Sequence, residues 1–344
     1  MPPKIFLVGG LGTIGKRVTE AIRKQNDMDI LGVGDIKRSR SFVNYTGQQL
    51  ASEGVDLYAL PDKMDLFREA EIDPTGTIQE GIEKADLVVD ATPGGIGEKN
   101  KPKYEKAGVK TLFQGGESAS VAEVAFNSFW NYDDAKGAQF VQVVSCNTTA
   151  LCRIVYALKE FGVKRVRGVL VRRGGDPRQV NRGPINAIIP KHHIPSHHAE
   201  DVKRCIPDLN ITTVALKVPT TLMHVHSLNL SLEERVTEGE IIEQMEDTTR
   251  IIVATEDIGN TAQIVEWARD MGRKRYDVPE VIVWPGTVKV EGNEAFISYA
   301  VHQESIVVPE NIDAIRSVLE IEEDRDKSIK KTDNALNIRD KLTF

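Results

Sequence analysis

The chain has 344 residues, a length that usually divides into two domains. Hydrophobic residues make up 40% of the sequence and charged residues 28%, the composition of an ordinary globular protein. The formal net charge is -7 and the sequence has no long basic run, which argues against a general nucleic-acid-binding protein.

Membrane and secretion signals are missing from the sequence. Its apolar runs fall short of the roughly 18 residues that a membrane-spanning helix needs. The N-terminal segment MPPKIFLVGG lacks the charged region and the cleavage site of a signal peptide. Three cysteines are too few for a disulfide framework, so we expect a cytoplasmic protein with no membrane partner.

The first half of the chain alternates strand-like and helix-like segments. Apolar runs predict strands at residues 4–9, 29–35, 85–93, 110–116 and 140–145. Helical spacing of apolar residues predicts helices at residues 16–25, 77–85 and 121–132, whereas residues 36–60 are expected to be irregular. The alternation predicts an α/β fold with a doubly wound parallel sheet of the Rossmann type.

The pattern changes after residue 162. Strand-like runs come closer together, at residues 165–173, 211–219, 224–232, 280–292 and 295–303, with helix-like segments at 238–247 and 259–272. This predicts an α+β domain with a mostly antiparallel sheet and helices on one face. The tail from residue 307 reads as helical, with Pro309 in a first turn.

A glycine-rich turn separates the first strand from the first helix. The segment GLGTIG places Gly10, Gly12 and Gly15 after the strand and at the opening of the helix. This spacing in this context is typical of dinucleotide binding: Gly10 forms the tight turn, Gly12 admits the pyrophosphate, and Gly15 lets the helix pack on the strand. The alternative is a glycine turn that binds nothing.

Asp35 ends the second strand, at the usual distance of about 20 residues beyond the glycines. A carboxylate at this place accepts hydrogen bonds from the adenosine ribose and repels a 2′-phosphate. Lys37, Arg38 and Arg40 follow at once and would pair with such a phosphate, unless they form a solvated basic loop. The expected cofactor is NAD or NADP, with NAD favoured.

Cys146 lies where a strand-like run meets an amphipathic helix, in the segment QVVSCNTTALCRIVYALKEF. Asn147 and Thr148 are residue types that favour a helix start. The helix dipole is expected to stabilise the thiolate and to lower the pKa of the thiol, which makes Cys146 a competent nucleophile. The alternative is a cysteine that only packs in the core, which suits Cys152 and Cys205 better.

Every histidine of the chain follows this cysteine, and a nucleophilic thiol needs a base. His224 and His226 share one face of a strand-like run, while His197 and His198 lie in a loop. A zinc site is the rival explanation, but the sequence lacks close cysteine pairs and HExxH spacing, so no metal is expected. A purely structural role also fits His192, His193 and His226.

Groups suited to phosphate lie near the thiol in sequence or at a strand end. Arg172 and Arg173 end a strand-like run beside a glycine pair, and Thr148 and Thr149 add hydroxyl groups next to the cysteine. Guanidinium and hydroxyl donors suit a phosphorylated substrate. The alternative is an ordinary surface arginine pair.

Longer motifs follow one another from residue 5 to about residue 316: GGLGTIGKRV, FQGGE, VVSCNTTAL, RRGGDP, PSHHAEDV, PTTLMHVH and YAVHQESIVVPENIDAIR. In content and order they resemble the archaeal-type (class II) phosphorylating glyceraldehyde-3-phosphate dehydrogenases. One departure is Asp35, because members of that family often carry a lysine after the second strand, which favours NADP.

The resemblance implies a dinucleotide-binding domain over residues 1–144, a catalytic domain over residues 145–305 and a C-terminal helical segment, residues 306–344, that packs back on the first domain. It also implies a cytoplasmic homotetramer, with His224 as the catalytic base. The dinucleotide-contacting positions of the family correspond to Thr13, Ile14, Gly116, Arg173 and Gln303. Its triose-phosphate positions correspond to Ser145, Cys146, Asn147, His197 and His198.

The expected reaction oxidises D-glyceraldehyde 3-phosphate, with inorganic phosphate and NAD(P)+, to 1,3-bisphosphoglycerate in glycolysis or gluconeogenesis. Cys146 attacks the aldehyde, His224 takes the proton, hydride passes to the nicotinamide, and phosphate displaces the acyl group from the thioester. Asn147 and backbone amides would stabilise the oxyanion. The two phosphate groups would be held by Arg172, Thr148, Thr149, His197 and His198.

Two other functions stay open at this point. One is a related Cys/His semialdehyde dehydrogenase of the aspartate-semialdehyde or N-acetylglutamyl-phosphate type, although RRGGDP and PSHH do not obviously supply the carboxylate- or amino-binding groups it needs. The other is a dinucleotide-sensing scaffold with a disused site, in which Cys146 would react no faster than Cys152 or Cys205.

Overall fold

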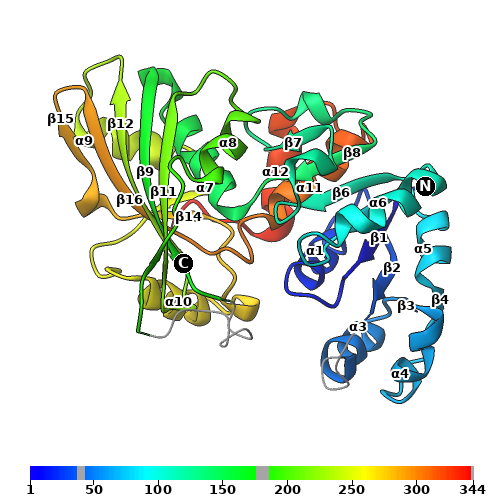
Figure 1. Ribbon diagram of the computed structural model, residues 1–344. Coiled ribbons are helices and arrows are strands. Elements are labelled where there is room, and N and C mark those ends of the chain that lie inside the picture. Colours follow the sequence, from blue (N-terminus) through cyan, green and yellow to red (C-terminus); the bar gives the residue numbers. More distant parts are fainter. Residues whose placement is uncertain (37–42, 176–185, 342–344) are drawn as a thin grey trace. The chain divides into compact units, whose positions relative to one another are not determined.

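The computed structural model describes residues 1–36, 43–175 and 186–341 and separates the chain into two compact units (Figure 1). The first unit consists of Met1–Ser145 and Val308–Leu336, and the second of Cys146–Val307 and the chain from Asn337 onward. In the described part of the chain, no helix has both the length and the apolar character needed to cross a membrane. The end of the RRGGDP motif lies outside the described residues, as do Lys37, Arg38 and Arg40.

The first unit is built on a parallel sheet of eight strands, and all hydrogen-bonded neighbours in it are parallel. From edge to edge the strands are β4 (Gly76–Thr77), β3 (Leu57–Ala59), β2 (Asp29–Asp35), β1 (Lys4–Val8), β5 (Leu87–Asp90), β6 (Lys110–Gln114), β8 (Phe140–Val143) and β7 (Val124–Phe126). The chain moves outward from β1 to β4 and then returns to β5 on the other side of β1. Ligands of such sheets bind at this switch point, beyond the carboxyl ends of the strands.

This parallel sheet confirms the predicted doubly wound fold. The central strands β1 and β5 are apolar almost throughout, with Leu7 and Val89 fully buried, as expected for strands covered on both faces. The helices that connect the strands are α1 (Gly15–Ile22), α3 (Gln48–Ser52), α4 (Met64–Arg68), α5 (Ile78–Lys84) and α6 (Gly97–Ala107).

Two segments differ from the expectation. Residues 36–60, expected to be irregular, contain α3 and β3, and residues 121–132, expected to be helical, form β7 and a turn. In the turn, Oδ1 of Asn131 accepts the backbone N–H of Asn127 (2.8 Å), and Oδ1 of Asn127 accepts that of Phe129 (3.2 Å). Such local bonds satisfy the backbone without a helix and so compete with it.

Two C-terminal helices, α11 (Val308–Val318) and α12 (Arg325–Leu336), belong to the first unit. Helix α11 is buried along its whole length and packs against α1, β6 and β8, with Pro309 in its first turn. Its Arg316 is 1% exposed and binds Asp27 through Nε (2.8 Å) and Gln25 through Nη2 (2.7 Å). A buried arginine therefore ties α11 to the segment that follows α1.

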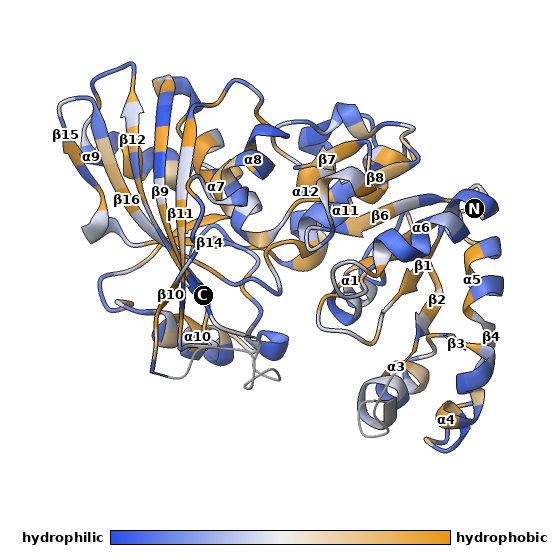
Figure 2. Ribbon diagram, viewed as in Figure 1, coloured by the Kyte–Doolittle hydropathy of each residue, from blue (hydrophilic) through white to orange (hydrophobic). Residues whose placement is uncertain are grey.

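The second unit contains a mixed sheet of eight strands. Its order is β10 (Ile189–Pro190), β11 (Ile211–Val218), β9 (Val163–Arg173), β12 (His224–Leu232), β16 (Glu294–Val301), β14 (Val281–Val283) and β13 (Ile251–Val253), with β15 (Lys289–Glu291) paired to β16. Five of the seven strand pairings are antiparallel, which confirms the predicted mostly antiparallel sheet. Figure 2 shows hydrophilic and hydrophobic residues alternating along β9.

The helices of the second unit are α7 (Cys146–Ala157), α8 (His197–Lys203), α9 (Glu238–Glu246) and α10 (Thr261–Asp270). Helix α7 packs against α8, α9 and β16. Fully buried Arg153 anchors it by donating hydrogen bonds to the carbonyl oxygens of Pro279 (2.6 Å) and Ile306 (3.0 Å). Because every second residue of β12 is buried, His224 and His226 point to the same face, as the alternation predicted.

Replacing Arg316 with alanine is expected to lower the free energy of unfolding by about 3 kcal/mol, because Asp27 keeps its charge but loses its buried partner. The control is Arg68→Ala, which removes an exposed pair with Asp65 and should cost less than about 1 kcal/mol. Urea unfolding followed by circular dichroism measures both. Equal effects of the two substitutions would contradict the role given to Arg316.

Candidate active site

The glycine turn lies at the carboxyl end of β1, and α1 begins at Gly15. The positive φ angle falls on Gly9 (φ 76°), and Gly10 is the first central residue of the turn that begins there. A Cβ atom at Gly15 would lie 2.5 Å from Cα of Gly10, and one at Gly10 would lie 2.3 Å from Val33. Gly12 follows in the same turn, and its N–H donates to the Gly9 carbonyl oxygen (2.9 Å).

The neighbouring positions Thr13 and Ile14 complete the connection to α1. Ile14 is the residue that precedes the first helical residue, and the Thr13 carbonyl oxygen accepts a hydrogen bond from Arg17 (2.7 Å). Asp35, at the carboxyl end of β2, is 5% exposed and accepts the Leu11 N–H through Oδ2 (3.0 Å). Its carboxylate therefore lies directly beside the glycine turn.

The loops after β5 and β6 meet at the same edge of the sheet. A Cβ atom at Gly94 would lie 2.5 Å from the carbonyl oxygen of Gly116, and one at Gly115 would lie 2.3 Å from the backbone nitrogen of Ser145. The carboxylate of Glu117 accepts the backbone N–H groups of Gly95 (3.0 Å), Gly97 and Glu98, at the start of α6. Glu117 was not among the candidate residues, although an acidic residue beside a glycine-rich loop is a recognisable signal for such a contact.

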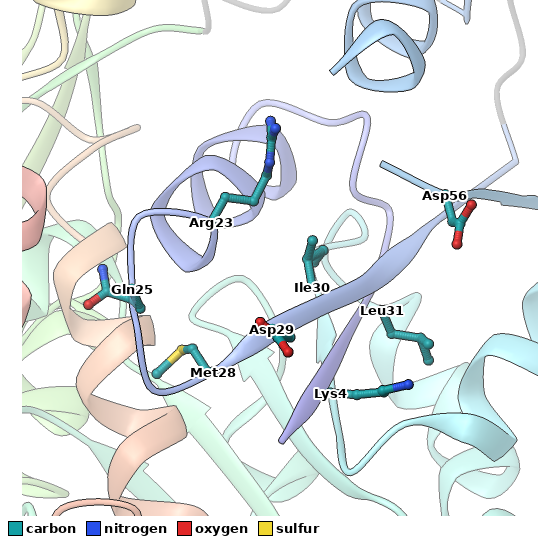
Figure 3. Close-up of a pocket in the computed structure, with 8 residues that line it drawn as sticks. All are labelled: Lys4, Arg23, Gln25, Met28, Asp29, Ile30, Leu31 and Asp56. Atoms are coloured by element: carbon teal, nitrogen blue, oxygen red, sulfur yellow. The ribbon is translucent and has the colours of Figure 1, made fainter. Parts of the chain in front are cut away.

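A pocket of about 390 Å³ lies elsewhere in the first unit, at the amino ends of β1 and β2 (Figure 3). Its charged lining is balanced, since Lys4 and Arg23 face it together with Asp29 and Asp56. Ligands of open parallel sheets bind at the opposite, carboxyl ends of the strands, so this pocket is separate from the glycine turn.

In the second unit, the thiol of Cys146 contacts the imidazole of His224. Cys146 is the first residue of α7, and His224 is the first residue of β12. The distance between Cys146 Sγ and His224 Nε2 is 3.7 Å. Cys146 is partly exposed, whereas Cys152 and Cys205 are buried. The thiol at the helix start is thus both in contact with an imidazole and partly exposed.

The second ring nitrogen of His224 determines its protonation. Nδ1 accepts the backbone N–H of Arg173 (3.0 Å), so in the neutral ring the proton is on Nε2 and points toward the sulfur. Burial lowers the pKa of His224 well below its usual value, and His226, Arg172 and Arg173 act in the same direction. The imidazole is therefore a neutral hydrogen-bond donor toward Cys146.

Burial raises the pKa of the Cys146 thiol. Arg172, Arg173 and a backbone hydrogen bond from Asn147 act in the opposite direction with smaller effect. The expectation of a lowered thiol pKa is therefore wrong, because the loss of hydration at this site outweighs the two guanidinium groups and the Asn147 backbone hydrogen bond. The negative charge of a thiolate has to be stabilised by specific donors.

One such donor is the side chain of Asn147, whose Nδ2 lies 3.6 Å from Cys146 Sγ. Its Oδ1 lies 3.0 Å from His226 Nε2, and His226 Nδ1 lies 3.0 Å from the hydroxyl oxygen of Tyr299. Asn147, His226 and Tyr299 are all almost completely buried. A structural role for His226 is consistent with the expectation from the sequence, whereas Tyr299 was not among the candidate residues.

Arg173 and Gln303, expected to contact a dinucleotide, converge on one carboxylate. Arg173 Nη1 donates to Glu304 Oε1 (2.9 Å), and Gln303 Nε2 donates to Glu304 Oε2 (2.7 Å). All three residues are less than 10% exposed. Glu304 was not among the candidate residues, although a carboxylate in the largely apolar run YAVHQESIVV requires such partners.

Cationic and imidazole groups gather near the end of β9. Arg172 lowers the pKa of His197, after the larger effect of burial, and burial with Arg172 lowers the pKa of His198 to about 2. Within the described ranges, Arg172 Nε and both ring nitrogens of His198 are buried without a hydrogen-bond partner. His197, His198 and Asp201 each offer an atom that could bind a metal ion, all within 4.8 Å of one another. The nearby guanidinium favours an anion over a cation there.

The remaining candidates differ in accessibility. Ser145 is partly exposed, whereas Thr148 and Thr149, in the first turn of α7, are fully buried. His192 and His193 are exposed. The structure therefore collects Cys146, Asn147, His224, Arg172 and Arg173 around the sulfur, with His197 and His198 near Arg172.

Comparison with known proteins extends this picture. Residues 145–273 match the model of the glyceraldehyde 3-phosphate dehydrogenase C-terminal domain. The chain is 50% identical to glyceraldehyde-3-phosphate dehydrogenase 1 of Methanosarcina barkeri, covering 97% of this chain and 98% of that protein. It is 49% identical to the Hyperthermus butylicus glyceraldehyde-3-phosphate dehydrogenase, covering 96% of each, and 46% identical to that of Methanothermus fervidus, covering 97% and 99%.

A similar solved structure is that of aspartate semialdehyde dehydrogenase II from Vibrio cholerae, with a TM-score of 0.66 and 12% sequence identity. The similarity covers 92% of this chain and 98% of that one, and at this identity it shows a shared fold. The identity of about 50% to relatives over nearly the whole chain establishes the family. The chain belongs to the archaeal-type glyceraldehyde-3-phosphate dehydrogenase family.

Proposed function

We propose that this protein oxidises D-glyceraldehyde 3-phosphate, with inorganic phosphate and NAD(P)+, to 1,3-bisphosphoglycerate, through a thioester on Cys146. The observation that carries the proposal is the 3.7 Å contact between Cys146 Sγ and His224 Nε2 at the start of α7. The relatives of about 50% identity are named for this substrate. The family membership makes the protein an NAD(P)-dependent aldehyde oxidoreductase that acts in glycolysis or gluconeogenesis.

The dinucleotide is assigned to the first unit and the catalytic chemistry to the second, with boundaries near residues 144 and 305. The crowded turn at Gly10, Gly12 and Gly15 supports this assignment, because a side chain at Gly10 or Gly15 would collide with the backbone or with Val33. Thr13, Ile14, Asp35, Gly116, Arg173 and Gln303 would complete the cofactor contacts. When bound, the nicotinamide supplies the hydride acceptor for the oxidation.

Cys146 is the proposed nucleophile. Its thiol loses a proton to solvent, the thiolate adds to the aldehyde carbon, and the carbonyl oxygen becomes an oxyanion. Oxidation of this adduct gives a thioester, whose carbonyl carbon inorganic phosphate then attacks while the Cys146 thiolate leaves. The N–H groups of Asn147 and His224 are the donors available to the negative charge on sulfur or oxygen.

His224 is proposed as a neutral hydrogen-bond donor to this charge. To act as the base that the family resemblance suggests, the ring would have to carry its proton on Nδ1, where the Arg173 N–H already points. An imidazolium would also carry a proton on Nδ1, opposite the Arg173 N–H. Its positive charge would be buried and close to Arg172 and Arg173. A neutral imidazole that donates through Nε2 requires no such rearrangement.

Arg172, His197 and His198 are proposed to hold phosphate. Nε of Arg172 and both ring nitrogens of His198 are buried and lack partners among the described residues. The exposed His197 ring lies beside His198, with 3.9 Å between the ring centroids. Thr148 and Thr149 are fully buried, which favours packing in the first turn of α7 over contact with phosphate. Ser145 stays a candidate contact of the triose phosphate. We also propose a homotetramer in the cytoplasm, in keeping with the family resemblance.

A semialdehyde dehydrogenase of the aspartate or N-acetylglutamyl-phosphate type would share the fold but requires other substrate-binding groups. Parallel assays with each aldehyde, with and without phosphate, separate these activities. The proposal is supported if glyceraldehyde 3-phosphate is the one aldehyde among those tested that gives phosphate-dependent reduction of NAD(P)+. Preference for another aldehyde would overturn it.

Two substitutions of His224 separate a donor from a base. His224→Leu removes both functions and should lower kcat by about a hundredfold or more. His224→Gln keeps an N–H donor and should retain at least about tenfold more activity than the leucine variant, with unchanged cofactor affinity. Steady-state kinetics measure both, and an equal loss in the two variants would point to proton abstraction instead.

The cofactor preference is proposed to be NAD, because the Asp35 carboxylate lies beside the glycine turn. Asp35→Asn keeps an oxygen for the Leu11 N–H but removes the charge, and it should improve kcat/KM with NADP relative to NAD by about tenfold. Asp29→Asn, at the other end of the same strand, is the matched control and should change nothing. A wild-type protein that prefers NADP would refute the proposal.

A further inference from the structure

A chain of hydrogen bonds leads from the interior of the second unit to the reactive sulfur. Tyr299 on β16 and His226 on β12 are directly opposite each other in the antiparallel ladder, with 3.0 Å between the hydroxyl oxygen and His226 Nδ1. His226 Nε2 reaches Asn147 Oδ1 at 3.0 Å, and Asn147 Nδ2 reaches Cys146 Sγ at 3.6 Å. His226 and Tyr299 are fully buried. In this series of hydrogen bonds, His226 is one link and Tyr299 two links farther from the sulfur than Asn147.

The direction of every hydrogen bond in this series follows from its last acceptor, the Cys146 thiolate. A thiolate only accepts hydrogen bonds, so the Asn147 amide must turn its N–H toward sulfur and its oxygen toward His226. His226 Nε2 must then donate, which leaves Nδ1 as an acceptor. Tyr299 must therefore donate its hydroxyl proton to Nδ1. A single arrangement satisfies all four groups.

The surroundings keep this arrangement constant across the working pH range. Burial lowers the pKa of His226 to about 3, with a further effect of Arg172, so the ring stays neutral. Burial raises the pKa of Tyr299 well above its usual value, so the hydroxyl keeps its proton. A flipped Asn147 amide would present its oxygen to the thiolate and its N–H to the Nε2 proton, and both contacts would be repulsive.

We propose that His226 and Tyr299 are positioning residues for catalysis: together they hold the Asn147 amide with its N–H toward the Cys146 sulfur. This inference rests on the proposed function, in which Cys146 is the nucleophile. The held amide stabilises the thiolate and the charge that develops when it reacts. His224, fixed separately by the Arg173 backbone, is the second donor to the same atom.

Removal of the Tyr299 hydroxyl tests the far end of the chain. Tyr299→Phe frees the His226 tautomer, so the Asn147 amide should populate its flipped state, and kcat should fall by about five- to tenfold with an unchanged KM for the aldehyde. The midpoint of the pH profile of Cys146 alkylation by iodoacetamide should rise by about half a pH unit or more. The other charged groups that act on this thiol are Arg172, Arg173 and Glu304, and the substitution leaves them in place.

Tyr132→Phe is the matched control. Tyr132 is also a buried tyrosine, and its hydroxyl donates to the Glu322 carbonyl oxygen (2.7 Å) in the first unit. The control should lose stability to a similar extent as Tyr299→Phe while its kcat and its alkylation profile stay at the wild-type values. A merely structural role of Tyr299 would make the two variants alike.

His226 gives a second, independent arm with a rescue. His226→Leu removes the donor to Asn147 and should lower kcat by about tenfold or more, whereas His226→Gln restores an N–H donor and should recover most of that loss. If His226→Leu fails to fold, Tyr299→Phe still decides the question, since the proposal requires its five- to tenfold loss of kcat. A wild-type kcat and alkylation profile of Tyr299→Phe would overturn the proposal.

The Cys146→Ser variant separates this inference from the proposed function. Full activity of Cys146→Ser would refute the thioester mechanism. An inactive Cys146→Ser, combined with wild-type behaviour of Tyr299→Phe and His226→Gln, would leave the mechanism standing and refute only the positioning role. An inactive Cys146→Ser with the expected losses in the other variants supports both.

Discussion

The sulfur of Cys146 has to carry a negative charge at a place with little water, and the second unit is arranged around that constraint. Burial, with a smaller effect of Glu304, raises the pKa of the thiol despite the opposing effects of Arg172 and Arg173. The charge therefore depends on directed N–H groups from Asn147 and His224, at 3.6 and 3.7 Å from the sulfur. Each donor is oriented by a second hydrogen bond: Asn147 by His226, and His224 by the backbone N–H of Arg173.

The sheet of the second unit provides the rigid frame for these donors. His226 pairs with Tyr299 across β12 and β16, and the alternation of β12 brings His224 to the same face. Helix α7 is fixed by the bonds of its buried Arg153, so that its first residue stays opposite these histidines. In the first unit, the carboxyl ends of β1, β2 and β6 bring together the glycine turn, Asp35 and Gly116, the groups proposed for the dinucleotide.

Much of this organisation could be predicted from the sequence. Apolar periodicity gave both sheets, and the helix start at Cys146 followed from Asn147 and Thr148. The segment around Asn127 was predicted wrongly as helical, because its asparagine side chains bind the local backbone, which periodicity does not reveal. The thiol pKa was also predicted in the wrong direction, since burial depends on tertiary packing. The contact of Tyr299 with His226 and that of Glu304 with Arg173 join residues that are distant in sequence, so the sequence alone does not reveal them.

The central claim is that Cys146 becomes acylated during turnover. Mass spectrometry of the protein mixed with glyceraldehyde 3-phosphate and excess NAD(P)+, in buffer free of phosphate and quenched in acid, tests it directly. The account predicts a phosphoglyceroyl group on the peptide that contains Cys146, which disappears when phosphate is added before the quench. Rapid NAD(P)H formation with an acyl group on another residue, or with none on the protein, would contradict it.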